Sequence, residues 1–137
     1  MTLGLAIAIA AGGGLGALLR YGAQLLWPAR GASVPLAVLL VNVVGSAIGG
    51  VVLALTTAGS APLVSSAVAL VIATGFCGGL TTFSTFSVET VELATSGAWR
   101  SAAANVALNV VLGLGAGGLA FAGTNAVIIL TSGAFVG

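Results

Sequence analysis

The chain of 137 residues is 59% hydrophobic and only 4% charged, whereas a water-soluble domain carries about 25% charged residues. It has three basic side chains, two acidic ones and no histidine, so only a lipid bilayer is a suitable solvent for its surface. The small net charge excludes a basic patch for nucleic acid, and the scarcity of titratable groups argues against catalysis. We therefore expect an integral membrane protein that is not an enzyme.

Three polar segments divide the chain, and its prolines, which end helices, fall in or beside them. The apolar stretches between these segments are residues 3–26, 34–57, 63–95 and about 99–121. Because about 20 apolar residues cross a bilayer as a helix, these stretches predict one all-α membrane domain over residues 1–137 with four transmembrane helices.

The first stretch places Gly12, Gly16 and Arg20 four residues apart, on one face of a helix. Small residues on such a face allow another helix to approach closely. Arg20 lies near one membrane surface, where it either reaches the lipid headgroups or provides a fixed positive charge that attracts an anion or makes a fold contact.

The second stretch carries Asn42, with Gly45 and Gly49 on the same face. A carboxamide inside a membrane is costly unless it is hydrogen-bonded, so Asn42 should face protein or a pore. The sequence alone leaves open whether it joins two helices or contacts a transported ion.

The third stretch, residues 63–95, is too long for one crossing. As a continuous helix it would extend about 50 Å, against about 30 Å of hydrocarbon. The run GFCGGLTTFSTF at residues 75–86 combines glycines with hydroxyl residues and predicts a break near residues 78–82. A break at this depth exposes backbone groups that protein or a watery cavity must satisfy, and transporters use such groups to bind ions. The alternative is a glycine kink whose hydroxyls bond their own turn.

Phe83 and Phe86 follow the break one turn apart, with Ser84 and Thr85 between them. The edge of an aromatic ring is partly positive, so two ring edges that face one point attract an anion. Packing in a hydrophobic core is the alternative role for the rings. Glu89 lies farther along, near the end of the span, as a surface charge or as part of a pore vestibule.

The fourth stretch places Asn105, Asn109, Gly113 and Gly117 at intervals of four residues. This stripe either joins helices or forms a polar track along a pore. The first, second and fourth stretches contain no carboxylate, lysine or histidine, which argues against a proton-coupled carrier, since such a carrier needs an embedded titratable group. The amides, hydroxyls, ring edges and single arginine favour passive conduction of an anion.

Three strings in this order, GGGLGALLRY, VNVVGS and GFCGGLTTFSTFSVE, resemble the Fluc or CrcB family of fluoride channels over essentially the whole chain. The resemblance implies a four-helix subunit that forms an antiparallel, dual-topology dimer with two pores. Such a dimer exports fluoride passively across the bacterial inner membrane and so lowers its cytoplasmic concentration. Because fluoride is small and strongly hydrated, its conduction needs several weak sites whose donors replace water.

The resemblance also implies roles for single residues. The implied fluoride pathway includes Arg20, Asn42, Phe83, Ser84, Thr85, Phe86 and Glu89. The backbone carbonyls of Gly78 and Thr81 would hold a central structural sodium ion, which fits the preference of hard cations for oxygen.

Three positions depart from the usual pattern of that family. Val38 stands where the family often has threonine, and Asn105 and Asn109 stand where it often has tyrosine and serine. We place both asparagines in the pathway, although the departures leave the ligand set of one pore open.

The competing functions are a small dual-topology, proton-coupled multidrug exporter and a non-conducting assembly subunit. The exporter needs a glutamate in the first helix, and this chain has none there. Arg30 and Arg100 are expected in loops on one side, which would place both termini outside the cell. With membrane lipid around it, we expect a homodimer, and a heterodimer with a diverged homologue is the alternative.

Overall fold

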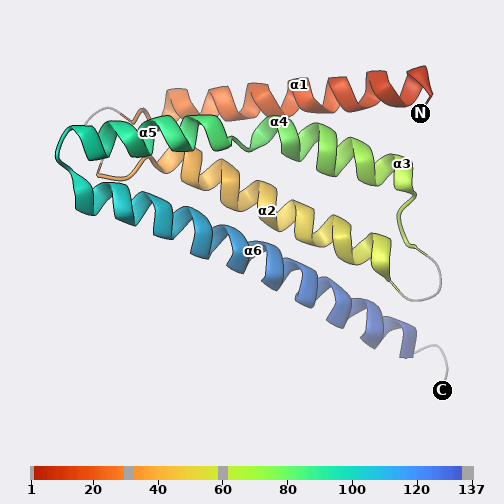
Figure 1. Ribbon diagram of the computed structural model, residues 1–137. Coiled ribbons are helices and arrows are strands. Elements are labelled where there is room, and N and C mark those ends of the chain that lie inside the picture. Colours follow the sequence, from red (N-terminus) through yellow and green to blue (C-terminus); the bar gives the residue numbers. More distant parts are fainter. Residues whose placement is uncertain (1, 30–32, 59–61, 134–137) are drawn as a thin grey trace.

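The computed structural model describes residues 2–29, 33–58 and 62–133, and within these ranges every regular element is a helix (Figure 1). In chain order the elements are α1 (Leu3–Leu26), α2 (Leu36–Thr57), α3 (Ser66–Ala69), the π-helix η1 (Leu70–Cys77), α4 (Gly78–Leu80), α5 (Phe83–Thr95) and α6 (Trp99–Gly133). Arg30 lies outside the described residues.

Four helical segments are long and apolar enough to cross a membrane. They are α1, α2, the composite third span Ser66–Thr95 and α6, which confirms the predicted four-span, all-α membrane fold. Most of their side chains point away from the bundle, and large apolar residues such as Leu18 and Leu119 are exposed. A helix that is apolar on all sides suits a lipid environment.

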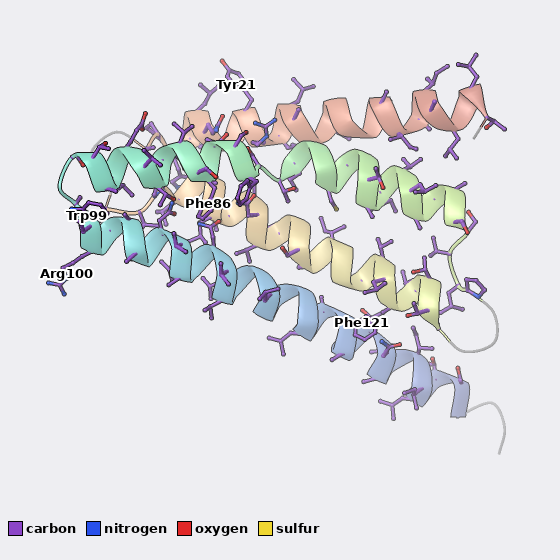
Figure 2. The ribbon with its side chains drawn as sticks, in the orientation of Figure 1. Tyr21, Phe86, Trp99, Arg100 and Phe121 are labelled. Atoms are coloured by element: carbon purple, nitrogen blue, oxygen red, sulfur yellow. The ribbon has the colours of Figure 1, made fainter. Side chains whose placement is uncertain are left out.

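The second span forms the centre of the bundle. α1 packs along η1 and α4, while α2 packs along α6, and both termini lie at the same end (Figure 1). Most of the buried apolar side chains belong to α2, and Val38 is fully buried. At the opposite end, Figure 2 shows Trp99 and Arg100 pointing outward where α5 joins α6.

Glycines permit the close contact of α1 with the third span. A Cβ atom at Gly16 would overlap the carbonyl oxygen of Phe76, and a Cβ at Gly79 would overlap the carbonyl oxygen of Gly13. The two backbones therefore touch directly, as small residues in membrane helices allow. Gly12 lies on the same face, near the Val71 carbonyl, so the predicted stripe of small residues is the packing face of α1.

The helix boundaries differ from the expected ones at three places. α2 begins at Leu36 rather than 34, because Pro35 precedes it. The third span begins at Ser66 rather than 63, because the Ser65 hydroxyl caps it by accepting from the Val68 N–H. The fourth helix, expected to run to about 121 with the apolar tail extending or capping it, continues as α6 to Gly133. Its glycines do not end it, because a helix in lipid must keep its backbone hydrogen bonds.

The third span breaks where the sequence predicted. α4 ends at Leu80, Thr81 and Thr82 are extended with ψ angles of 157° and 116°, and α5 begins at Phe83. Arg100, expected in a loop, lies instead in the first turn of α6. The π-helix η1 that precedes the break was not predicted.

Candidate functional site at the break of the third span

The side chain of Asn42 occupies the break. Its Oδ1 accepts a hydrogen bond from the Thr82 backbone N–H at 2.9 Å, and its Nδ2 donates to the Thr82 carbonyl at 3.4 Å. Backbone groups at membrane depth need such partners because no water competes for them. One carboxamide on α2 thus satisfies both polar groups of the residue at which the helix is interrupted.

The same carboxamide begins a chain of amides that crosses to α6. Asn42 Nδ2 also donates to Asn109 Oδ1 at 3.0 Å, and Asn109 Nδ2 donates to Asn105 Oδ1 at 3.1 Å and to the Asn105 carbonyl at 3.0 Å. Asn105 is fully buried, and its Nδ2 donates to the Thr90 hydroxyl at 2.9 Å. The structure therefore joins three predicted site residues from two helices into one network that starts at the break.

Arg20 approaches the break from the opposite flank. Its Nε donates to the Gly79 carbonyl at 3.1 Å, and the side chain is half-buried. In a continuous helix the Phe83 N–H would bond this carbonyl. Of the interpretations left open by the sequence, the fold contact is therefore the one observed, and it replaces a helical hydrogen bond that the break removes.

Hydroxyl groups gather at the start of α5. Thr82 caps the helix, since its Oγ1 accepts from the Thr85 N–H at 3.2 Å and donates to Thr85 Oγ1 at 2.9 Å. Ser84 Oγ also lies 3.3 Å from Thr82 Oγ1. The N-terminus of a helix carries partial positive charge, so this hydroxyl cluster stands in a field that favours an anion.

The two phenyl rings flank this cluster in different environments. The ring centroids of Phe83 and Phe86 are 5.7 Å apart at an interplanar angle of 48°. Phe83 is 81% exposed, whereas Phe86 is partly covered. The rings are therefore neighbours, but within this subunit they do not form a closed hydrophobic core.

Besides the Gly79 carbonyl, the carbonyls of Gly78 and Thr81 lose their helical partners at the break. The Thr82 N–H, which would bond the Gly78 carbonyl in a helix, bonds Asn42, and the Thr85 N–H, which would bond the Thr81 carbonyl, bonds the Thr82 hydroxyl. Among the described residues no hydrogen bond to either carbonyl is found. Free carbonyl oxygens are the ligands that sodium and other hard cations prefer, so Gly78 and Thr81 fit the expected ion.

Glu89 stands two turns along α5 from the break. It is half-buried, and its Oε2 atom is buried without a hydrogen-bond partner among the described residues. It lies apart from the amide network, which meets α5 at Thr90 and Phe86 instead.

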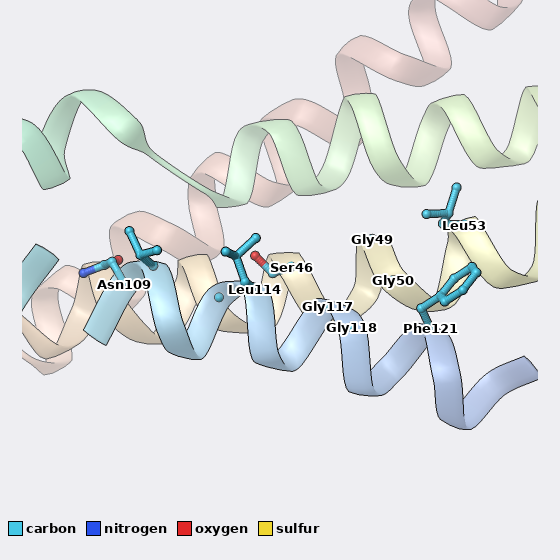
Figure 3. A pocket seen from close by; sticks show the side chains of 11 residues that line it. Ser46, Gly49, Gly50, Leu53, Asn109, Leu114, Gly117, Gly118 and Phe121 are labelled. Atoms are coloured by element: carbon cyan, nitrogen blue, oxygen red, sulfur yellow. The ribbon is translucent and has the colours of Figure 1, made fainter. Parts of the chain in front are cut away.

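A groove of about 620 Å³ runs between α2 and α6, and Asn109 lies at one end of it (Figure 3). Ser46, one turn beyond Asn42, and the glycines of both helices line its middle, with Leu53 and Phe121 at the far end. The helices meet so closely here that a Cβ at Gly50 would overlap the Gly117 carbonyl. A second groove, of about 570 Å³, lies between α2 and the third span and shares Gly49 and Leu53 with the first.

Comparison with known proteins decides the family. Residues 7–124 match the family model described as CrcB-like protein, Camphor Resistance (CrcB). The chain belongs to the CrcB-like family. This family assignment confirms the resemblance read from the three sequence strings.

Curated members of the CrcB-like family are similar over most of the chain. Three of them bear the name fluoride-specific ion channel FluC. The protein from Shewanella loihica is 44% identical over 107 residues, 77% of this chain and 84% of its own. The one from Saccharophagus degradans is 44% identical over 112 residues, 80% and 81% of the two chains. The one from a Roseiflexus species is 46% identical over 110 residues, 79% and 86%. These relatives are named as channels and not as enzymes, and this multi-pass membrane protein is likewise not an enzyme.

Sequence reasoning on the CrcB-like pattern missed three contributors to the site. Ser46 was quoted within VNVVGS without a role, and Thr82 was included only as the last residue of the predicted break. Thr90 was not considered, because a threonine in a helix usually bonds its own preceding turn. Their roles depend on which helices pack together, and the sequence did not specify that.

Proposed function

We propose that this chain is the subunit of a passive fluoride channel that lowers cytoplasmic fluoride. The observation that carries the proposal is the break of the third span in a chain of the CrcB-like family. There Asn42 is bonded to the interrupted backbone, and hydroxyls and phenyl rings follow directly. The relatives named fluoride-specific ion channel support the choice of ion.

The donors around the break suit a small, strongly hydrated anion. Ser84 and Thr85 offer hydroxyls, the three asparagines of the network offer amides, and none of these groups carries a full charge. Asn42 and Asn109 use both of their amide hydrogens within the network, so in this proposal an ion at these amides replaces one of the network bonds. Several weak neutral sites replace water without trapping the ion, which conduction requires. In this proposal Phe83 and Phe86 present ring edges to fluoride, and Arg20 and Glu89 lie toward the pathway's end.

The active form in this proposal is an antiparallel homodimer with two pores. Phe83 supports it, because a ring that is 81% exposed beside polar groups needs a covering surface. A heterodimer with a diverged homologue would cover the same surface. The multidrug exporter is less well supported, since α1 contains no carboxylate to couple protons.

Fluoride efflux from liposomes that hold only this chain tests the proposal. With sodium on both sides, we expect rapid fluoride efflux at a fluoride electrode and no chloride leak. The Phe83→Ile variant should lose most of the efflux, while Leu119→Ile, a change at an exposed position of α6, should retain it. Absence of efflux from folded wild-type dimer would contradict a self-sufficient homodimer, and a chloride leak would contradict fluoride selectivity.

We also propose that Gly78 and Thr81 bind a structural sodium ion through their released carbonyls. An ion that binds only the folded protein raises its unfolding temperature in proportion to the logarithm of its concentration. We expect sodium chloride to raise the midpoint of thermal unfolding, and N-methylglucamine chloride at the same ionic strength to leave it unchanged. Equal effects of the two salts would contradict a specific site.

A further inference from the structure

The hydroxyl of Thr90 makes two hydrogen bonds, and only one of them is local. It donates its single hydrogen to the Phe86 carbonyl at 2.7 Å, and its oxygen accepts from Asn105 Nδ2 at 2.9 Å. Because a carbonyl cannot donate, the hydroxyl hydrogen stays directed at Phe86 and the oxygen presents only lone pairs to Asn105. Thr95 shows the ordinary case, since its hydroxyl bonds carbonyls of its own helix and contacts no other helix.

The other end of the amide network is equally fixed. The Thr82 backbone N–H can only donate, and it donates to Asn42 Oδ1 at 2.9 Å. The network thus runs from a group that must donate, through Asn42, Asn109 and Asn105, to a group that must accept.

Between these two ends each carboxamide has one consistent orientation. If Asn105 turned over, its Oδ1 would face the lone pairs of Thr90, and its Nδ2 would face Asn109 Nδ2. Asn105 is fully buried, so water cannot relieve either conflict. Thr90 therefore decides that Asn105 presents Oδ1 to Asn109. Asn109 Nδ2 is held by the Asn105 backbone carbonyl as well, and Asn109 Oδ1 receives the Asn42 amide hydrogen at 3.0 Å.

We propose that Thr90 is a positioning residue of the fluoride pathway: its hydroxyl is the terminal acceptor that fixes the orientation of Asn105, and so keeps Asn105 Oδ1 bonded to Asn109, which in turn bonds Asn42 at the break. Thr90 acts through the amides and not by contact with the ion. Only the expected effect of Thr90 on fluoride flux rests on the proposed channel function. The network itself is a property of the fold and is tested separately.

Selective nitrogen-15 labelling of asparagine tests the network without any transport assay. The chain has only four asparagines, so the side-chain amide spectrum of the purified protein contains four NH₂ pairs. Asn125 is an internal reference, since its Nδ2 bonds the Phe121 carbonyl of its own helix. We expect Thr90→Val, which keeps the shape and removes the hydroxyl, to shift the signals of Asn105, Asn109 and Asn42 and to leave Asn125 in place.

Two further variants complete the test. Thr90→Ser retains the hydroxyl and should restore the wild-type amide signals, and Thr95→Val is the matched control that should move none of them. A shift confined to Asn105 would overturn the proposal, because the effect of the Thr90 hydroxyl would then not reach Asn109 and Asn42. If Thr90→Val does not fold, Thr90→Ala is judged by the same signals.

Fluoride efflux then tests the consequence for the pathway. We expect Thr90→Val to reduce efflux about tenfold, the effect of disturbing a buried hydrogen bond, while Thr90→Ser and Thr95→Val conduct like wild type. Wild-type efflux in Thr90→Val, despite shifted amide signals, would overturn the positioning role. If wild type itself conducts no fluoride, the channel function fails, and the amide signals still show whether Thr90 orients the network.

Discussion

The two flanks of the broken span are held by different means. Toward α1, backbone lies against backbone through glycines, and Arg20 adds one hydrogen bond to the Gly79 carbonyl. Toward α2 and α6, carboxamides form a directed network that ends on the interrupted backbone. The first flank depends on the absence of side-chain atoms, and the second depends on the presence of particular ones. Close backbone packing through glycines therefore fixes where the third span is interrupted. The carboxamide network fixes which polar groups face the break.

The largest effect is expected from adding one methyl group on the glycine flank. Gly16→Ala places a Cβ against the Phe76 carbonyl and the Leu80 N–H, which cannot move aside as a flexible side chain would. Overpacking against a side chain costs about 1–3 kcal/mol, but here the overlap is with backbone, so α1 and the third span must separate and lose their whole contact. We therefore expect little folded protein and a strongly lowered unfolding temperature.

The matched control for that change is Gly14→Ala, where a Cβ meets no atom within 4 Å. Alanine is the better helix former, so this variant should be as stable as wild type or slightly more stable. Thermal unfolding in detergent compares the two. Equal stability of the two variants would mean that the backbones of α1 and the third span do not touch as closely as described.

A smaller but still large effect is expected on the amide flank. Asn42→Leu removes the partners of the Thr82 N–H and carbonyl and of Asn109 Oδ1. Each unsatisfied buried group costs about 1–3 kcal/mol, so we expect lower thermal stability and no fluoride efflux. Asn125→Leu, which removes only a bond within α6, should change neither. Wild-type efflux from Asn42→Leu would remove this residue from the pathway.

The smallest effect is expected at Arg20. A substitution there tests whether the positive charge or the planar guanidinium donor is required. Arg20→Lys keeps the positive charge but loses the planar donor that reaches the Gly79 carbonyl. If the bond matters, stability falls by about 0.5–1.5 kcal/mol, the usual net worth of a hydrogen bond. Arg100→Lys, at an exposed position, should have no effect. Wild-type stability of Arg20→Lys would show that charge alone is required.

The sequence predicted the parts of the molecule that depend on composition and local pattern. Four spans followed from the apolar stretches, and the break followed from the glycine and hydroxyl run at residues 75–86. Length alone did not require it, since α6 has 35 residues and no break. Asn42 was recognisable because an amide is out of place in lipid. The apolar residues of the tail indicated that the fourth helix extends past 121, but nothing in them marked its end at Gly133.

The contacts of the site were harder to predict, because they depend on which helices meet. Arg20 had two possible roles until α1 was seen to pack on α4. Asn105 and Asn109 formed a stripe on α6, but nothing in their spacing showed that Asn42 would meet Asn109 or that Thr90 would meet Asn105. Thr90 itself is one of several threonines in the third span, and only its second hydrogen bond distinguishes it.

The pairing of Asn42 with Thr82 has a consequence for which residues can stand at the break. A carboxamide has the same donor and acceptor as a peptide group, so Asn42 pairs with Thr82 much as a neighbouring β-strand would, through one N–H and one carbonyl. A single side chain thereby supplies one rung of a sheet inside an all-helical membrane protein. Aspartate lacks the donor, and leucine lacks both groups, so only asparagine or the longer glutamine carries the full set.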